Sequence, residues 1–117
     1  GLVMKSKVDH IALLVDDLEK AEAWYVEHLD AEVEFRDEYY IRLRLENTCV
    51  ALIDKAKYPK EHIGILIEDI KDLPLEKGEM VKHRDGTIGV YVKDPFGNYL
   101  EYIWYSDQQK EVFLKNG

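Results

Sequence analysis

The sequence predicts an α+β fold in which two βαβββ modules form a curved, cupped mixed sheet with helices outside. The first observation behind this is a repeat: residues 9–20 (DHIALLVDDLEK) align without a gap with residues 61–72 (EHIGILIEDIKD), so that His10 lies on His62. The second is the order of elements, because one helical pattern and three strand-like runs follow each copy. Duplication of one supersecondary unit explains both observations.

The elements of the first module follow from the spacing of its apolar residues. Residues 8–15 form a short apolar run that is typical of a buried strand. Asp16 or Asp17 can cap a helix over about 18–29. The apolar side of this helix comprises Leu18, Ala21, Tyr25 and Leu29. Further strands are predicted over 31–36, where Val33 and Phe35 share a face, over 39–45 and over 48–54.

The second module repeats this order with a shorter helix. Its first strand covers 62–67, and Pro74 closes the following helix after about one turn. Turn signals at 84–87 and 94–98 separate three more strands, predicted over 79–83, 87–92 and 99–105. We therefore expect one domain over 7–105, with modules 7–54 and 61–105, a linker at 55–60 and a C-terminal tail at 106–117.

Composition narrows the class of partner. The 117 residues carry 16 basic and 24 acidic side chains, and the net charge of -8 argues against nucleic acid or an anionic membrane surface as partner. No apolar run approaches membrane-spanning length. Cys49 is the only cysteine, which excludes an intramolecular disulfide and fits a cytoplasmic protein.

Side-chain alternation along the strands predicts a metal site between the modules. His10 and His62 point away from the isoleucine-rich face of their strands, and small Ala12 and Gly64 beside them leave room for a cavity. Glu101 lies in an apolar run, where a carboxylate is costly unless it is paired or bound to a cation. Two imidazoles and one carboxylate are a ligand set for a divalent transition metal with open coordination positions. The alternative is that the histidines are ordinary core or edge residues.

Candidate substrate-binding residues lie on the same face of neighbouring strands. Arg42 and Arg44 alternate with apolar residues on the strand 39–45, and Tyr91 holds a similar place in the second module. Arginine suits carboxylate or phosphate oxygens, which suggests a small anionic substrate. The alternative is that both arginines lie on a solvated sheet edge.

Three stretches of the chain resemble the vicinal oxygen chelate superfamily, which includes glyoxalases, bleomycin resistance proteins and extradiol dioxygenases. They are VDHIALLVDDLEKAEAWYVEHL, EHIGILIEDI and VKDPFGNYLEYIW, and the resemblance extends from about residue 7 to 105. It implies that His10, His62 and Glu101 hold one divalent metal ion (Mn, Fe, Ni, Co or Zn). It also implies a small-molecule substrate, a homodimer, and a metal-dependent lyase, transferase or dioxygenase.

One position departs from part of that superfamily. Glyoxalases and epimerases carry a further Glu or Gln ligand on the fourth strand of the first module. Alignment of 47–54 with 97–104 sets Ala51 at the position of Glu101, although a slip of two would place Cys49 there. A three-ligand site resembles the fosfomycin-modifying or dioxygenase branches. The alternative function is that of a metal-free protein that sequesters a ligand, as bleomycin resistance proteins do.

Overall fold

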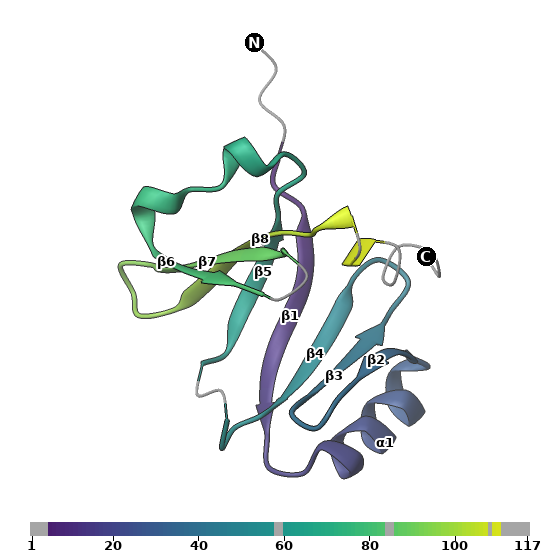
Figure 1. Cartoon of the computed structure of the whole chain (residues 1–117). Coiled ribbons are helices and arrows are strands. Elements are labelled where there is room, and N and C mark those ends of the chain that lie inside the picture. The colour runs from purple at the N-terminus through teal and green to yellow at the C-terminus, as the bar shows by residue number, and fades with distance from the viewer. Residues whose placement is uncertain (1–4, 58–59, 84–85, 108, 111–117) are drawn as a thin grey trace.

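A single mixed sheet of eight strands organises the computed structural model, which describes residues 5–57, 60–83, 86–107 and 109–110. The strands lie in the order β2-β3-β4-β1-β5-β8-β7-β6, and the sheet is not closed (Figure 1). Their bounds are β1 Val8–Val15, β2 Glu32–Arg36, β3 Tyr40–Arg44, β4 Cys49–Asp54, β5 His62–Leu66, β6 Glu79–Lys82, β7 Ile88–Lys93 and β8 Tyr99–Trp104. The predicted α+β fold of two βαβββ modules is confirmed.

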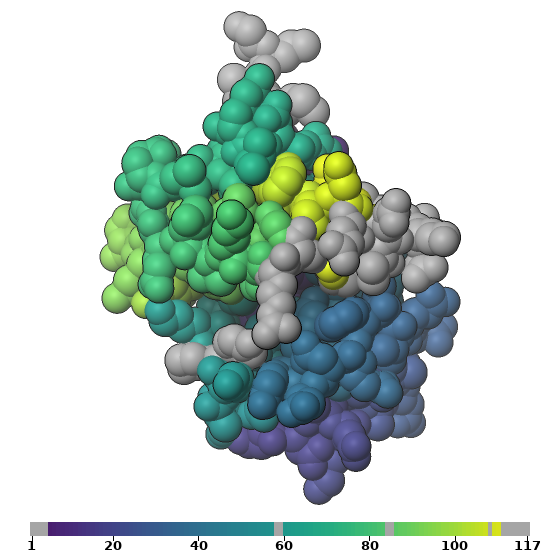
Figure 2. Space-filling view, viewed as in Figure 1, coloured from purple at the N-terminus to yellow at the C-terminus, as the bar shows by residue number. Residues whose placement is uncertain are grey.

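The two modules join through the first strand of each. β1 is parallel to β4 and β5 is parallel to β8, whereas β1 and β5 pair antiparallel at the centre of the sheet. In the space-filling view, the helix and β2–β3 (purple to blue) lie at one end and β6–β8 (green to yellow) lie towards the other (Figure 2). The central pair of strands is therefore the seam between the two copies.

The helix α1 (Leu18–Leu29) covers one face of the first module. The Asp17 carboxylate caps it by accepting a hydrogen bond from the Lys20 amide, so Asp17, and not Asp16, fills the position that the sequence left open. The side chains that pack on the core beneath are Leu18, Ala21, Tyr25 and Val26. The expectation for Leu29 is wrong, because Leu29 is 45% exposed and Val26 takes its place.

Short 3-10 turns replace the helix in the second module. They are η1 (Ile70–Asp72) and η2 (Leu75–Lys77), with Pro74 between them, as the shortened pattern predicts. Ile11 and Ile63 on the central strands stay exposed as a result. In the parts of the chain that the structure describes, no helix has the length and apolar character needed to cross a membrane. Arg84 and Asp85 of the predicted turn, and most of the tail 106–117, lie outside the described residues.

Two bulges break the regular alternation of side chains. The pairing of β1 with β5 shifts between Val8 and His10, and the pairing of β2 with β3 shifts between Val33 and Phe35. Asp9 and Glu34 are the extra residues at these shifts. The expectation that Val33 and Phe35 share a face is wrong for this reason: Val33 is exposed, whereas Phe35 packs against the interior cluster of Ile103 and Tyr105.

Candidate metal centre

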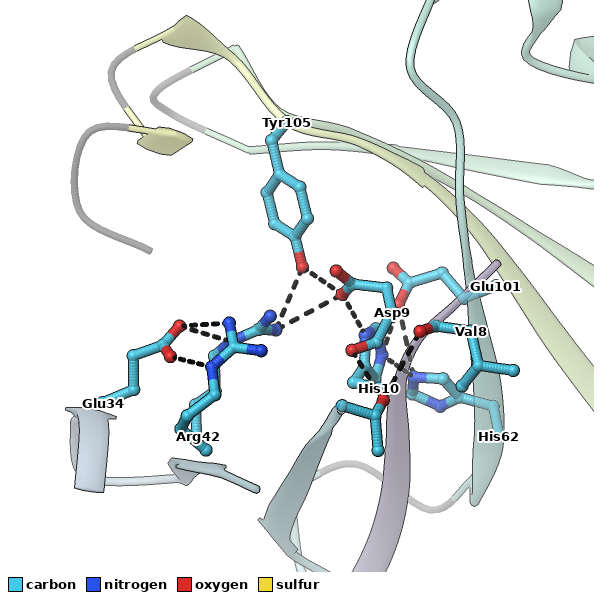
Figure 3. Close-up of polar contacts among 10 residues, drawn as sticks. Val8, Asp9, His10, Glu34, Arg42, His62, Glu101 and Tyr105 are labelled. Atoms are coloured by element: carbon cyan, nitrogen blue, oxygen red, sulfur yellow. Dashed lines mark hydrogen bonds and ion pairs between the residues drawn. The ribbon is translucent and has the colours of Figure 1, made fainter. Parts of the chain in front are cut away.

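Three donor atoms from three adjacent central strands converge in the interior of the cup (Figure 3). His10 comes from β1, His62 from β5 and Glu101 from β8, and these residues are 5%, 8% and 4% exposed. His10 Nε2 lies 3.1 Å from His62 Nε2 and 3.3 Å from Glu101 Oε1, and His62 Nε2 lies 3.2 Å from the same oxygen. The structure thus brings together all three residues that the sequence suggested as metal ligands.

Glycines beside the site make room for two of these side chains. Gly64 in β5 pairs with His10 in β1 and with Glu101 in β8, so it lies between these two residues across the sheet. A Cβ atom on Gly64 would lie only 2.2 Å from His10 Cε1, and one on Gly89 would lie 2.4 Å from Glu101 Oε2. Each glycine is therefore needed for the close approach of a candidate ligand.

Hydrogen bonds on the far side of each ring fix which nitrogen faces the site. His10 Nδ1 lies 2.7 Å from Asp9 Oδ2, and His62 Nδ1 lies 3.2 Å from the main-chain oxygen of Lys60. An ionised carboxylate and a carbonyl can only accept, so each neutral ring carries its proton on Nδ1. Both Nε2 lone pairs then point at one another and at the Glu101 oxygen.

The carboxylates in and beside this site are ionised at neutral pH. Burial raises the pKa of Glu101, but its hydrogen bonds and charge interactions with His10 and His62 outweigh this and lower it to about 2. Burial likewise raises the pKa of Asp9, while the contacts with His10 and Arg42 lower it to about 2. Burial lowers the pKa of His10, but Asp9 and Glu101 raise it above its usual value. The site therefore attracts a cation.

The spacing of the three atoms fits coordination of a single ion. Donors that each lie roughly 2.1 Å from a metal, at angles of about 90–109°, are roughly 3.0–3.4 Å from one another. The observed separations of 3.1, 3.2 and 3.3 Å lie within this range. His10, His62 and Glu101 could thus hold a divalent metal ion.

A network of buried charges extends from Asp9 away from the three ligands (Figure 3). Arg42 is 2% exposed, and it contacts Asp9 Oδ2 through Nη1 at 3.3 Å and Glu34 Oε1 through Nε at 3.1 Å. Arg44 Nε donates to Glu34 Oε2 at 2.7 Å. The Tyr105 hydroxyl lies 2.5 Å from Asp9 Oδ2 and accepts from Arg42 Nη1 at 3.0 Å. Two guanidinium groups are thus offset by two carboxylates.

The three donors open into a cavity of about 560 Å³. Apolar walls surround them, formed by Phe35, Ile53, Val81 and Ile103. Tyr91 also lines the cavity, and its ring stands edge-on to His62 with the centroids 5.2 Å apart. Of the two arginines predicted to bind substrate, Arg42 lines this cavity, whereas Arg44 lines a separate small pocket with Glu32 and Val33.

The strand register settles the counterpart of Glu101 in the first module. Ala12 pairs with Ala51 between β1 and β4, as Gly64 pairs with Glu101 between β5 and β8. Ala51 lines the cavity at this position, which confirms the alignment. The alternative with Cys49 is wrong, because Cys49 pairs with His10, as Tyr99 pairs with His62. A methyl group therefore stands where a fourth protein ligand would come from.

Sequence reasoning missed the residues that support the ligands. Asp9, Glu34 and Tyr105 all join the network around Arg42, and Gly89 makes room for Glu101. Asp9 carried a signal, because an acidic residue precedes the histidine in both copies of the repeat, and Tyr105 alternates onto the same strand face as Glu101. The bulges that turn Asp9 and Glu34 inwards depend on the partner strands.

Comparisons with known proteins point to one family. Residues 7–102 match the family model described as Glyoxalase/Bleomycin resistance protein/Dioxygenase superfamily. No curated protein matches the chain. Among solved structures, a member of this superfamily from Vibrio splendidus 12B01 is 15% identical with a TM-score of 0.65, over 86% of this chain and 100% of the other.

Two further solved structures share the fold. Methylmalonyl-CoA epimerase from Mycobacterium tuberculosis is 16% identical with a TM-score of 0.64, over 92% of this chain and 95% of the epimerase. The E323L mutant of homoprotocatechuate 2,3-dioxygenase from Brevibacterium fuscum is 20% identical with a TM-score of 0.61, over 86% of this chain and 32% of the dioxygenase. At sequence identities this low, the similarity to these structures shows a shared fold and nothing more specific.

Proposed function

The chain belongs to the Glyoxalase/Bleomycin resistance protein/Dioxygenase superfamily, and we propose that it is a metal-dependent enzyme that chelates a small oxygen-rich substrate. The observation that carries the proposal is the convergence of His10 Nε2, His62 Nε2 and Glu101 Oε1 within 3.3 Å. When both rings are neutral, these are three lone pairs that face one another without a hydrogen between them. Such an arrangement is unfavourable unless a proton on one of the rings or a metal cation lies among them, and the proposal is that a metal cation does so.

Each residue of the site has a defined part in this proposal. His10, His62 and Glu101 would hold the metal, which when bound supplies a Lewis acid that polarises the oxygens of a chelated substrate. Ala51 offers only a methyl group, so coordination positions stay open towards the cavity. Apolar side chains line part of the cavity, and its volume of about 560 Å³ suits a small molecule.

The missing fourth ligand supports some reaction classes over others. Isomerisation needs a base that moves a proton between adjacent carbons, and a carboxylate at the position of Ala51 would be placed for this. A lyase, transferase or dioxygenase reaction with three protein ligands is therefore our proposal. The proposed substrate need not be anionic, because the carboxylates of Asp9 and Glu34 already pair with the guanidinium groups of Arg42 and Arg44.

The proposal also includes a homodimer in the cytoplasm. The exposed apolar side chains of Ile11 and Ile63, which no helix among the described residues covers, support association through the outer face of the central strands. The single free cysteine, Cys49, supports a reducing compartment.

Metal binding by the purified full chain tests the proposal. After removal of metal with a chelator, we expect one divalent ion per chain to bind when Mn, Fe, Co, Ni or Zn is offered, measured by elemental analysis and calorimetry. His10→Ala should lose this ion. His28→Ala is the matched control, because His28 stacks on Trp24 on the exposed side of α1. A wild-type chain that stays metal-free and yet binds an aromatic ligand would support the sequestering alternative instead.

A further inference from the structure

The two candidate histidine ligands are held in different ways. His10 Nδ1 contacts the Asp9 carboxylate at 2.7 Å, whereas His62 Nδ1 contacts only a main-chain carbonyl, at 3.2 Å. A carboxylate partner increases the basicity of an imidazole and fixes its orientation more strongly than a carbonyl does. We propose that Asp9 is a positioning residue that orients His10 and makes it the stronger of the two histidine donors to the metal, an inference that rests on the proposed function.

Asp9 is itself held firmly in place. Its side chain is about nine-tenths buried, and its Oδ2 atom receives contacts from His10 Nδ1, from the Tyr105 hydroxyl at 2.5 Å and from Arg42 Nη1 at 3.3 Å. Three donors on one oxygen restrict its rotation. The β1 bulge at Asp9 makes this arrangement available, since consecutive residues of a regular strand would point to opposite faces.

The repeat offers an internal comparison. Glu61 precedes His62 as Asp9 precedes His10, but Glu61 Oε2 accepts from the Leu14 amide at 3.0 Å instead of contacting the neighbouring imidazole. An acidic residue before the histidine is therefore not sufficient for this role. The contact depends on the bulge at Asp9 and on Arg42, which belong to the first module, and on Tyr105 at the end of the second module.

Zinc affinity of two matched variants tests the inference. Asp9→Asn keeps the shape and removes the charge, and we expect zinc to bind about 10- to 100-fold more weakly in calorimetry on the metal-depleted full chain. Glu61→Gln makes the same chemical change at the equivalent position, and we expect its affinity to stay within about twofold of wild type. Thermal unfolding of each metal-free variant separates a local effect from general destabilisation.

A spectroscopic readout distinguishes positioning from a structural role. In the zinc-loaded wild type, the Nδ1 proton of His10 should give a strongly downfield NMR signal, because it is shared with a carboxylate. Asp9→Asn should move this signal upfield while leaving that of His62 in place. If Asp9→Asn fails to fold, Tyr105→Phe is the substitute variant, because it removes one contact to Asp9 without touching His10. It should move the His10 signal in the same direction by a smaller amount.

The outcomes separate this inference from the proposed function. If wild type binds zinc, and Asp9→Asn or its substitute Tyr105→Phe shows the wild-type zinc affinity and the wild-type His10 signal, the inference is overturned. The proposed function is then left standing. Equal losses in Asp9→Asn and Glu61→Gln would also overturn it, because the effect would then come from charge near the site. A wild-type chain that takes up no metal overturns both.

Discussion

At the scale of single residues, the site depends as much on absent side chains as on present ones. The His10 ring lies directly over the Cα atom of Gly64, at a point where even a methyl group would overlap it. Ala12, which is almost fully buried, pairs with Ala51 on the neighbouring strand β4. These small residues form a depression in the sheet, and the imidazole and carboxylate groups fill it.

Gly64→Ala should therefore displace His10 and weaken metal binding without unfolding the protein. The added Cβ would overlap the His10 ring, so the ring must move away from Glu101. We expect zinc affinity to fall by about tenfold or more, because ligand distances tolerate changes of only about 0.2 Å. Calorimetry measures this change. Ile63→Ala, on the same strand but facing outwards, should bind zinc like wild type, and equal losses in both variants would contradict the explanation.

At the scale of elements, a short turn sets the position of Glu101. Asp94 Oδ1 accepts hydrogen bonds from the amides of Phe96 and Asn98 at 2.8 and 2.9 Å, and Asp94 Oδ2 accepts one from Asn98 Nδ2 at 3.1 Å. Gly97 follows with φ of 93°, which favours glycine. This turn joins β7 to β8 in the register that sets Tyr91 opposite Glu101.

The contribution of this turn to stability should depend on pH. Backbone hydrogen bonds, first of all from the Asn98 amide, lower the pKa of Asp94 below its ordinary value of 3.8. A folded-state pKa below the unfolded one stabilises the protein above pH 3.8, and this stabilisation is lost as the pH falls through the lowered value. Urea unfolding should show Asp94→Ala less stable than wild type at pH 7, with the difference shrinking in acid.

Glu76→Ala, which removes one exposed negative charge from η2, is the control for general charge effects. Its unfolding free energy should follow that of wild type at every pH. A difference between Asp94→Ala and wild type that stays constant down to pH 2 would contradict the assignment of the effect to the ionised Asp94 carboxylate.

The sequence predicted the elements well and their local irregularities poorly. The expected helix over 18–29 and the convergence of His10, His62 and Glu101 agree with the structure, because apolar periodicity, the repeat and the apolar run around Glu101 indicate them directly. The inward positions of Asp9 and Glu34 could not be predicted. One extra residue in a bulge exchanges the faces of its neighbours, and only the partner strand decides where that residue lies.

At the scale of the whole molecule, the candidate site lies on the seam between the modules. His10 belongs to the first module, whereas His62 and Glu101 belong to the second. The antiparallel pairing of β1 with β5 is the direct strand contact between the two halves of the sheet. An ion held by all three residues would cross-link the halves in addition to this pairing.

Metal should therefore stabilise the entire domain and not one half of it. An ion that binds only the folded chain adds about 2.7 kcal/mol to the free energy of unfolding at a free concentration 100 times Kd. We expect urea unfolding of the zinc-saturated protein to remain a single transition at higher urea, and EDTA to reverse the shift. His62→Ala should unfold identically with and without zinc, and a zinc-dependent shift in this variant would place the ion elsewhere.

The strand order has a consequence for how the protein matures in the cell. His10 lies near the beginning of the described chain and Glu101 near its end, yet the strands that carry them flank β5 on its two sides. A nascent chain on the ribosome holds His10 long before β8 has been synthesised, and long-range pairing of this kind forms late in folding. The three donors therefore meet only in the finished domain. Under the proposed function, a partly synthesised chain would lack the complete ligand set, so selection of the ion would wait until folding is complete.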